Sequence, residues 1–533
     1  MPHPVPIRSR PGPNPGPKAF AISCLLFCAV LARISAMTHG PDLLIGVAGG
    51  VVRGRMLPDG HGAVFKGIPF AQPPVGDLRW REPMPVAAWT GVRDAGQSGP
   101  PATQAPLGWN DRSASASGED CLYLDVWTPA GQAPAHNPVM VWIHGGANVA
   151  GAGGFDPLYD GAALIGRGVV LVVVEYRLGV FGFLAHPELT RESPHHASGN
   201  YAILDQIAAL RWVHDYIAGF RGDPGNVTIF GQSAGSEDVL ALMASPLSQG
   251  LFQRAIGESG PITQMKVQTL DEAEEAGARV AGKLGRSGHA DLLFLRTVAP
   301  GDLLEAGAEI HSFTTEGWVF PSSPLDVWSA GKEHRVPLII GSNAVEFRAG
   351  GSLDGIRQAI RDTFGTLSPK ALALYGLDGK GVWAADPVYG DAADQWGSDV
   401  FRCPAVVQGQ WHNGAGNPVW EYEFDRAIPP RPRVGHSSDL PYVFGNLYPA
   451  GSQGGDYQEA DRDLSATIQA YWTNFARTGD PNGPGLPRWP QYEEKGRTYL
   501  TFTAAAGVAL GRNQRGPFCD LFRELMDRPA PAR

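Results

Sequence analysis

Apolar runs typical of buried strands alternate along the chain with segments of helical period. Unbroken apolar runs of this length indicate parallel strands covered on both faces; they occupy residues 122–127, 138–143, 169–175, 227–230 and 337–341. Helical spacing of apolar residues predicts helices over 201–216 and 461–477. The alternation predicts a doubly wound α/β fold, with a mostly parallel central sheet and helices on both faces.

The chain from residue 37 begins with a different pattern. Short strand-like segments at 45–54 and 63–65 flank the turn Pro58-Asp59-Gly60, which predicts a short antiparallel N-terminal hairpin. Long loops rich in Pro and Gly are predicted at 96–118, 426–435 and 449–456. None of these loops separates two self-contained patterns, so residues 37–533 are expected to form a single domain.

Residues 1–36 have the pattern of a secretory signal peptide. Three basic residues, Arg8, Arg10 and Lys18, precede an apolar run over 19–31, and small residues within 32–36 offer a cleavage site. The alternative is an N-terminal membrane anchor, but the run is short for a bilayer span and Arg33 soon interrupts it. We therefore expect a secreted or periplasmic protein with no membrane span after signal cleavage.

The charge of the chain narrows the possible partners. Its formal net charge is −10 at pH 7, and removal of residues 1–36 would take away basic residues and no acidic ones. Nucleic acids and anionic membranes require a basic face that displaces counterions. The expected partner is therefore a small-molecule substrate, and the sequence leaves the oligomeric state open.

Cysteine and histidine positions predict no metal site. Cys24 and Cys28 would leave with the signal peptide, and three cysteines would remain, so at least one thiol must be unpaired. The adjacent His195 and His196 lie in a polar loop, where a solvated turn is expected rather than a ligand pair.

A G-x-S-x-G motif is the sharpest chemical signal. Gly231-Gln-Ser-Ala-Gly235 follows the strand-like segment 226–230 and precedes a segment compatible with a helix. A nucleophile elbow needs this context, because flanking glycines remove Cβ clashes in a tight turn from strand to helix. The helix N-terminus would also direct its amides toward the serine. Ser233 is therefore the predicted nucleophile.

A second motif offers donors for a developing negative charge. The strand-like segment 139–143 runs into His144-Gly145-Gly146-Ala147. In acyl transfer, backbone amides aimed at the oxyanion of the tetrahedral intermediate lower the barrier. We predict an oxyanion hole formed by the amides of Gly146, Ala147 and Ala234; the alternative is a Gly-Gly turn without a catalytic part.

A nucleophilic serine needs a base and an orienting acid, in the chain order Ser, acid, His. The histidines that follow Ser233 are His289, His311, His334, His412 and His436. His436 is the predicted base, because it lies in a turn-rich loop, Val-Gly-His-Ser-Ser-Asp-Leu-Pro. Glu346 is the predicted acid, because it follows the strand 337–341 at the carboxyl end, where open α/β sheets place their sites.

These motifs together resemble the type-B carboxylesterase and cholinesterase branch of the α/β-hydrolases. The resemblance spans nearly all of the chain after the signal peptide and rests, besides the serine motif, on segments 65–76, 119–126, 176–179, 440–445 and 472–481. It implies an α/β-hydrolase fold and hydrolysis of carboxylic esters through an acyl-enzyme, without a metal or organic cofactor. It also implies the same triad and the same three oxyanion donors.

The resemblance implies structural features as well. Buried ion pairs are expected between Arg79 and Glu119 and between Arg177 and Asp205. Cys403 and Cys519 lie where some relatives form a disulfide, and we treat that pairing as a hypothesis. Cys121 lacks the upstream partner of its counterpart in relatives, so it is expected to be a free buried thiol.

The chain departs from the family pattern beside two triad residues. Gln232 precedes the serine where many relatives carry a carboxylate, so a charge that might assist the imidazolium is absent. Phe347 follows the acid where a glycine is usual, and it is expected to narrow the pocket or repack its floor.

The predicted function is a serine-dependent carboxylesterase. A lipase for long-chain esters shares every catalytic feature, but no long apolar lid is evident over 96–118. A hydrolase for one specialised ester fits equally well. A non-catalytic binding module on the same fold belongs to a different class, and the presence of all three triad residues argues against it.

Overall fold

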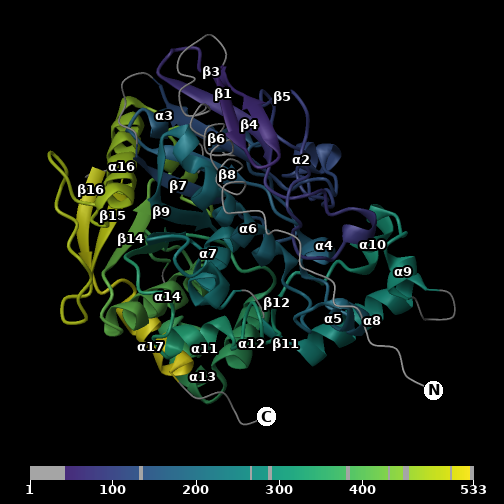
Figure 1. The fold of residues 1–533 in the computed structure, drawn as a ribbon. Helices are drawn as coiled ribbons and strands as arrows, with labels where there is room; N and C mark the ends of the chain where they lie inside the picture. Colours follow the sequence, from purple (N-terminus) through teal and green to yellow (C-terminus); the bar gives the residue numbers. More distant parts are fainter. Residues whose placement is uncertain are drawn as a thin grey trace, which may run out of the picture.

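A mixed sheet of eleven strands forms the centre of the molecule (Figure 1). The structure is a computed structural model, which describes residues 43–130, 136–264, 267–285, 291–379, 385–429, 433–447, 455–503 and 507–527. The predicted signal peptide lies outside the described residues. From edge to edge the strands are β16 (Gly507–Arg512), β15 (Thr498–Thr503), β14 (Val419–Asp425), β13 (Leu338–Asn343), β10 (Arg254–Glu258), β9 (Gly222–Gln232), β7 (Asn137–Ile143), β8 (Val170–Val174), β6 (Tyr123–Pro129), β4 (Gly62–Pro69) and β3 (Arg55–Met56).

From β15 to β8 in this order the strands run parallel to one another, whereas β16 is antiparallel to β15 and β6 is antiparallel to β8. The mostly parallel α/β sheet is therefore confirmed. One assignment was wrong: residues 122–127 were predicted to lie in the parallel part, but β6 is antiparallel to both β4 and β8. A strand covered on both faces has the same apolar run in either direction, so its pattern does not report its direction.

The predicted N-terminal hairpin is present, with a different division of its strands. The turn at 58–60 joins β3 and β4, which pair antiparallel. Residues 45–54 instead fold back on themselves as β1 (Leu44–Val47) and β2 (Gly50–Arg53). Together with β5 (Val92–Asp94) they form a separate three-stranded sheet.

Helices cover both faces of the main sheet. On one face, α6 (Tyr201–Tyr216) and α7 (Ala234–Ala244) pack with Val141 and Val172 in one apolar cluster. On the other, α15 (Leu440–Phe444) and α16 (Glu459–Thr478) pack with Trp142 and Leu171 in a second cluster. Successive residues of β7 and β8 thus point to opposite faces, as strand geometry requires. The helix predicted over 201–216 is confirmed at its bounds, and that over 461–477 is slightly longer.

A further group of helices packs below the sheet edge in the view of Figure 1: α12 (Leu353–Phe364), α13 (Ser368–Leu374), α14 (Ala392–Gly414) and α17 (Gly516–Met526). The Cys403–Cys519 disulfide joins α14 to α17, which confirms the hypothesis of that pairing, and Cys121 is free and buried as expected. The remaining helices and strands are α2 (Asp111–Ala116), α3 (Ala162–Ile165), α4 (Gly179–Phe183), α5 (Pro187–Glu192), α8 (Leu270–Leu284), α9 (Leu292–Leu295), α10 (Pro300–Ala306), α11 (Pro324–Ser329), β11 (Val267–Thr269) and β12 (Phe313–Thr315).

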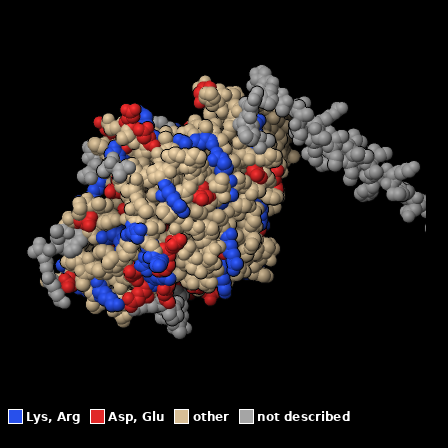
Figure 2. Space-filling model, turned by 90° about the vertical axis from the view of Figure 1, so that its left-hand side faces the viewer, with Lys and Arg blue, Asp and Glu red and all other residues tan. Residues whose placement is uncertain are grey.

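Both expected ion pairs are present and buried. Arg79 contacts Glu119 at 2.5 Å and Arg177 contacts Asp205 at 2.7 Å. Figure 2 shows Lys and Arg side chains interspersed with Asp and Glu on the face that carries β15, β16 and α16. Within the described ranges, no helix combines the length and hydropathy that a membrane crossing needs.

Candidate active site

Ser233 lies in a strained turn between β9 and α7. Its backbone has φ 57° and ψ −129°, an uncommon conformation for a residue with a side chain. The Ser233 N–H donates to the Glu258 carbonyl at 2.8 Å, and the Ser233 carbonyl accepts from the Ser236 N–H at 2.8 Å. The turn is therefore held from the neighbouring strand and from the first turn of the helix.

The two glycines of the motif are required by close backbone contacts. A Cβ at Gly231 would lie 2.4 Å from the Gly235 carbonyl oxygen, and a Cβ at Gly235 would lie 2.1 Å from the Ile143 carbonyl oxygen. Both distances are far below van der Waals contact. The strand, turn and helix arrangement expected of the motif is present, and the glycines let α7 approach the end of β7.

Glu346 and His436 form a hydrogen-bonded pair. His436 Nδ1 lies 2.7 Å from Glu346 Oε2, and the His436 N–H donates to the Glu346 carbonyl at 2.9 Å. The carboxylate is 3% exposed, and its Oε1 accepts from the Asn343 N–H at 2.6 Å. The Glu346 N–H donates to Ser398 Oγ at 2.9 Å. These bonds fix the carboxylate after β13 in the position that orients the imidazole.

Ser233, the third triad residue, is linked to the Glu346–His436 pair through Gln232, which precedes it in the sequence. Gln232, the last residue of β9, places its Nε2 3.1 Å from His436 Nε2. Among the described residues, the Ser233 hydroxyl makes no hydrogen bond to His436. The fold thus brings all three predicted triad residues to one edge of the sheet, with the Gln232 amide against His436 Nε2.

The predicted oxyanion donors lie on two segments. Gly146 (φ 116°) and Ala147 (φ 55°) are in the loop after β7, and Ala234 is the first residue of α7. Within the described part of the chain, none of these three amides donates a hydrogen bond to another residue. Unsatisfied N–H groups at a helix N-terminus and in a left-handed turn can bind an anion by donating hydrogen bonds to it.

Sequence reasoning missed the contact that joins these two segments. Asn148 Nδ2 donates to Asp238 Oδ1 of α7 at 2.8 Å, and Gln206 Nε2 of α6 donates to Asp238 Oδ2 at 2.6 Å. The Gly179 N–H also donates to the Asn148 carbonyl at 2.6 Å. Burial raises the pKa of Asp238 to about 7, against the lowering effect of its hydrogen bonds. We call the bond between Asn148 and Asp238 the clamp. The sequence indicated it only through polar residues, Gln206 and Asp238, within the apolar helices α6 and α7.

Aromatic rings cover the imidazole. The Phe347 ring centroid lies 4.3 Å from that of His436, and the Phe401 centroid of α14 lies 5.5 Å from it. Phe347 is 45% exposed. Phe347 therefore packs beside the base. Whether it narrows the pocket or repacks its floor stays a prediction.

Two further carboxyl groups lie under the site. Glu258 accepts from Trp472 Nε1 at 2.7 Å, and Asp439 accepts from the Tyr422 hydroxyl at 3.0 Å. Burial raises the pKa of Asp439 to about 6 and that of Glu258 well above its ordinary value. Both groups are buried and hydrogen-bonded to aromatic residues.

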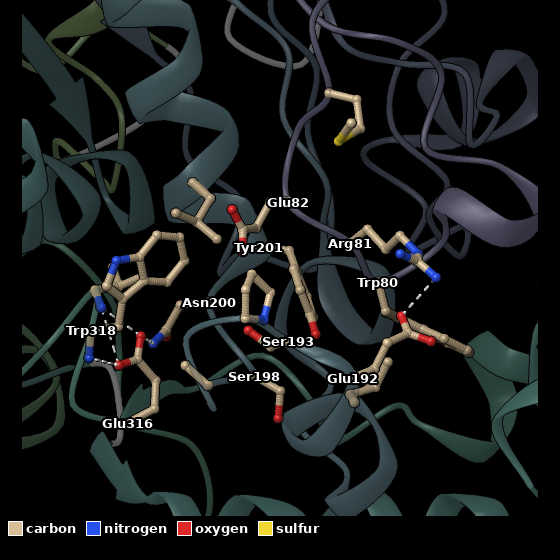
Figure 3. A pocket seen from close by; sticks show the side chains of 16 residues that line it. Trp80, Arg81, Glu82, Glu192, Ser193, Ser198, Asn200, Tyr201, Glu316 and Trp318 are labelled. Carbon is tan, nitrogen blue, oxygen red and sulfur yellow. Dashed lines mark hydrogen bonds and ion pairs between the residues drawn. The ribbon is translucent and has the colours of Figure 1, made fainter. Parts of the chain in front are cut away.

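A separate cavity of about 210 Å³ lies between α5, the start of α6 and the segment 80–84 (Figure 3). Its charged groups are paired: Arg81 contacts Glu192 at 3.1 Å, and Glu316 accepts from the Asn200 side chain at 2.9 Å. None of the six predicted site residues lines this cavity. His195 stacks on Trp318 in its wall, and the described residues contain no cluster of three His, Cys, Asp or Glu suited to a metal ion.

Known proteins are similar to this chain in sequence and fold over most of its length. The sequence model of the carboxylesterase family matches residues 41–364 and 387–519. The chain is 34% identical over 522 residues to fumonisin B1 esterase of Sphingopyxis macrogoltabida, covering 91% of this chain and 90% of that protein. It is 35% identical over 518 residues to carboxylesterase 3 of Homo sapiens, covering 88% and 89%. A solved PNB esterase structure superposes with a TM-score of 0.78 at 32% identity, covering 91% of this chain and 99% of that one.

Proposed function

The chain belongs to the carboxylesterase family of the α/β-hydrolases and hydrolyses carboxylic esters, and from this premise we propose that Ser233, Glu346 and His436 are its catalytic triad. One observation carries the assignment: the bonded Glu346–His436 pair lies beside a serine held in a strained elbow. The elbow exposes the hydroxyl, and the carboxylate keeps the imidazole proton on Nδ1, so that Nε2 can act as a base.

The mechanism follows from these positions. Ser233 Oγ attacks the ester carbonyl carbon while its proton passes to His436 Nε2, and the amides of Gly146, Ala147 and Ala234 bind the oxyanion. His436 then protonates the leaving alcohol as the acyl-enzyme forms. Water attacks the acyl-enzyme with the same base, which releases the acid and restores the serine. Each oxyanion donor typically contributes about 10²- to 10³-fold in rate.

Hydrolysis of p-nitrophenyl acetate, butyrate, octanoate and palmitate tests this proposal. The Ser233→Ala variant is expected to lose on the order of 10⁶-fold in kcat. Ser236→Ala is the matched control, because the hydroxyl of this buried serine of α7 donates to the Gly260 carbonyl at 2.8 Å and not to a triad residue. Retained turnover in Ser233→Ala would contradict the triad.

The same series separates the kinds of ester. Turnover that falls with acyl-chain length supports a broad carboxylesterase, and a preference for palmitate at an oil interface supports a lipase. Absence of turnover on all four esters by a folded protein supports a specialised ester hydrolase or a binding module. The relative named fumonisin B1 esterase motivates testing bulky polar esters in that case.

We also propose that the protein is exported and that residues 1–36 are removed. The basic and apolar pattern of this segment supports the proposal. The Cys403–Cys519 disulfide supports it too, because disulfides persist mainly in oxidising compartments. N-terminal sequencing of the protein recovered from periplasm and medium tests it. Recovery of a chain that still begins at Met1 only from the cytosol would contradict export.

A further inference from the structure

Gln232 is buried beside the base. The residue is 3% exposed, and its backbone pairs with Glu258 in the parallel ladder of β9 and β10. A Cβ added at Gly145 would lie 3.3 Å from Gln232 Oε1, so the amide fills the space between the oxyanion loop and the imidazole. The Nε2 atom of this amide lies 3.1 Å from His436 Nε2.

Hydrogen-bond chemistry fixes the state of the imidazole in this contact. A carboxylate accepts at Glu346 Oε2, so His436 Nδ1 carries a proton. With its Nε2 toward the ring, the Gln232 amide donates and His436 Nε2 accepts, which is the contact that a neutral ring can make. The amide of Gln232 thus donates to the same lone pair that must take the serine proton.

We propose that Gln232 is a positioning residue, which holds the neutral His436 in place through its Nε2 lone pair in the free enzyme and releases that lone pair to the serine proton as Ser233 reacts. This inference rests on the proposed triad. In the reaction, the Ser233 proton forms the new N–H bond at Nε2 as the O–H bond breaks. A half-turn of the Gln232 amide then presents Oε1, which can accept from the protonated ring.

The amide differs from a carboxylate at the same position. A neutral donor favours the uncharged imidazole, whereas a carboxylate within hydrogen-bond distance favours the imidazolium. Among the described residues, Glu346 contacts the base, Asp439 and Arg402 interact electrostatically with Glu346, and Glu258 interacts with Asp439. Arg402 bonds the carbonyls of Asn343 and Ala344 and contacts Asp399 at 2.5 Å. These groups are unchanged by substitution at Gln232.

The pH dependence of kcat/KM measures this role. Gln232→Met keeps the approximate length of the side chain but removes the donor, and we expect its acidic limb to move up by about 0.5 to 1 pH unit. Gln232→Glu is nearly isosteric, and we expect an upward move of about 1 to 3 units. In Gln232→Met, kcat on the pH plateau is expected to fall about 3- to 10-fold with KM unchanged, because the ring loses its orientation.

The control is Gln469→Met, which removes another buried amide, on α16, bonded to Ser465 rather than to the site. Its pH profile should match that of the parent protein. If the Gln232→Met limb and plateau also match the parent, the positioning role is wrong, while loss of activity in Ser233→Ala still supports the triad. If Ser233→Ala remains active, the proposed function itself fails. Circular dichroism and melting of each variant confirm that it is folded.

Discussion

Four residues at the proposed site have an unusual backbone. Ser233, Ala147, Asn148 and Ser437 all have φ between 55° and 67°, and each either supplies a proposed catalytic group or adjoins one. Such conformations cost about 1–3 kcal/mol and persist only where the surrounding contacts hold them. Here the contacts are backbone hydrogen bonds at Ser233 and a buried side-chain bond between Asn148 and Asp238, so the precision of the site depends on residues that do not react.

Asn148 provides a test of that dependence. Replacement by glycine, which adopts the φ of 56° freely, removes the bond to Asp238 and lets the oxyanion loop move relative to α7. We expect kcat for p-nitrophenyl butyrate to fall about 10- to 100-fold, with a small change in KM, because the donors act in the transition state.

The matched control is Asn513→Gly, at a φ of 53° outside the site, where the side chain bonds Arg497 at 3.2 Å. Its kcat should equal that of the parent protein. An equal loss in both variants, or in neither, would show that the clamp between Asn148 and Asp238 does not position the loop.

At the scale of elements, the site depends on how closely α7 approaches the sheet. The helix starts against the last residues of β7 and β9, where only glycines leave room. This contact places Ala234 beside the loop that carries Gly146 and Ala147, and so completes the oxyanion hole from two segments distant in sequence.

Gly235→Ala should therefore displace the whole of α7 and destabilise the folded protein. The added methyl would lie 2.1 Å from the Ile143 carbonyl oxygen, so the helix must move away from β7. We expect a loss of about 3 kcal/mol or more in the free energy of unfolding, or insoluble protein. Gly355→Ala in α12 is the control, since its Cβ would meet only Ser352 Oγ at 3.7 Å, and it should be neutral or slightly stabilising. Urea unfolding of both variants makes the comparison.

The disulfide links two helices that are 116 residues apart in sequence. Closing so long a loop restricts the unfolded chain, and its removal typically costs about 2–5 kcal/mol. We expect the Cys403→Ala/Cys519→Ala double variant to melt at a lower temperature than the oxidised parent. Dithiothreitol should lower the melting temperature of the parent and leave that of the double variant unchanged. A parent unaffected by reduction would contradict a stabilising disulfide.

For the whole molecule, burial of many carboxyl groups sets how stability depends on pH. Burial raises the pKa of Asp125 to about 6, of Asp238 to about 7 and of Asp439 to about 6, and raises those of Glu175 and Glu421 further. The folded state then binds more protons than the unfolded state above the ordinary carboxyl range near pH 4. Below that range, such a group does not lower the free energy of unfolding. As pH rises above it and through the pKa of the folded state, the group lowers the free energy of unfolding increasingly.

We therefore expect the free energy of unfolding to fall by on the order of 2–4 kcal/mol between pH 5 and pH 8. The buried histidines act in the opposite direction, since burial lowers the pKa of His144 to about 4, but fewer of them are perturbed. Urea titrations across this pH range measure the slope. Stability that rises with pH over the range would contradict the expectation.

Asp238→Asn identifies one contributor to that slope. The amide can still accept from Asn148, and it can donate to Gln206 Oε1, which is buried without a partner, once the Gln206 amide turns. The variant should lose less stability than the parent as pH rises from 5 to 8. Asp302→Asn, at an exposed carboxylate of α10, should keep the slope of the parent.

The sequence by itself determined the class of fold, the principal strands and helices, and the motif that carries the serine. These features are local: an apolar run, a helical period or a glycine pair produces the same element wherever it occurs. The selection of Glu346 and His436 also came from the sequence, through loops at strand ends and the resemblance to a family. The direction of β6 could not be predicted from the sequence, because a strand buried on both faces has the same apolar pattern in either direction.

Only the tertiary structure decided which polar groups meet. The contact of Gln232 with His436 joins residues 204 positions apart, and that of Asn148 with Asp238 joins residues 90 apart. The sequence shows such residues as ordinary polar positions, and their geometry follows from the packing of β9, α6 and α7 around them. The reactive groups could thus be named from the sequence, whereas the contacts that orient them depend on distances of a few ångströms that only the folded chain sets.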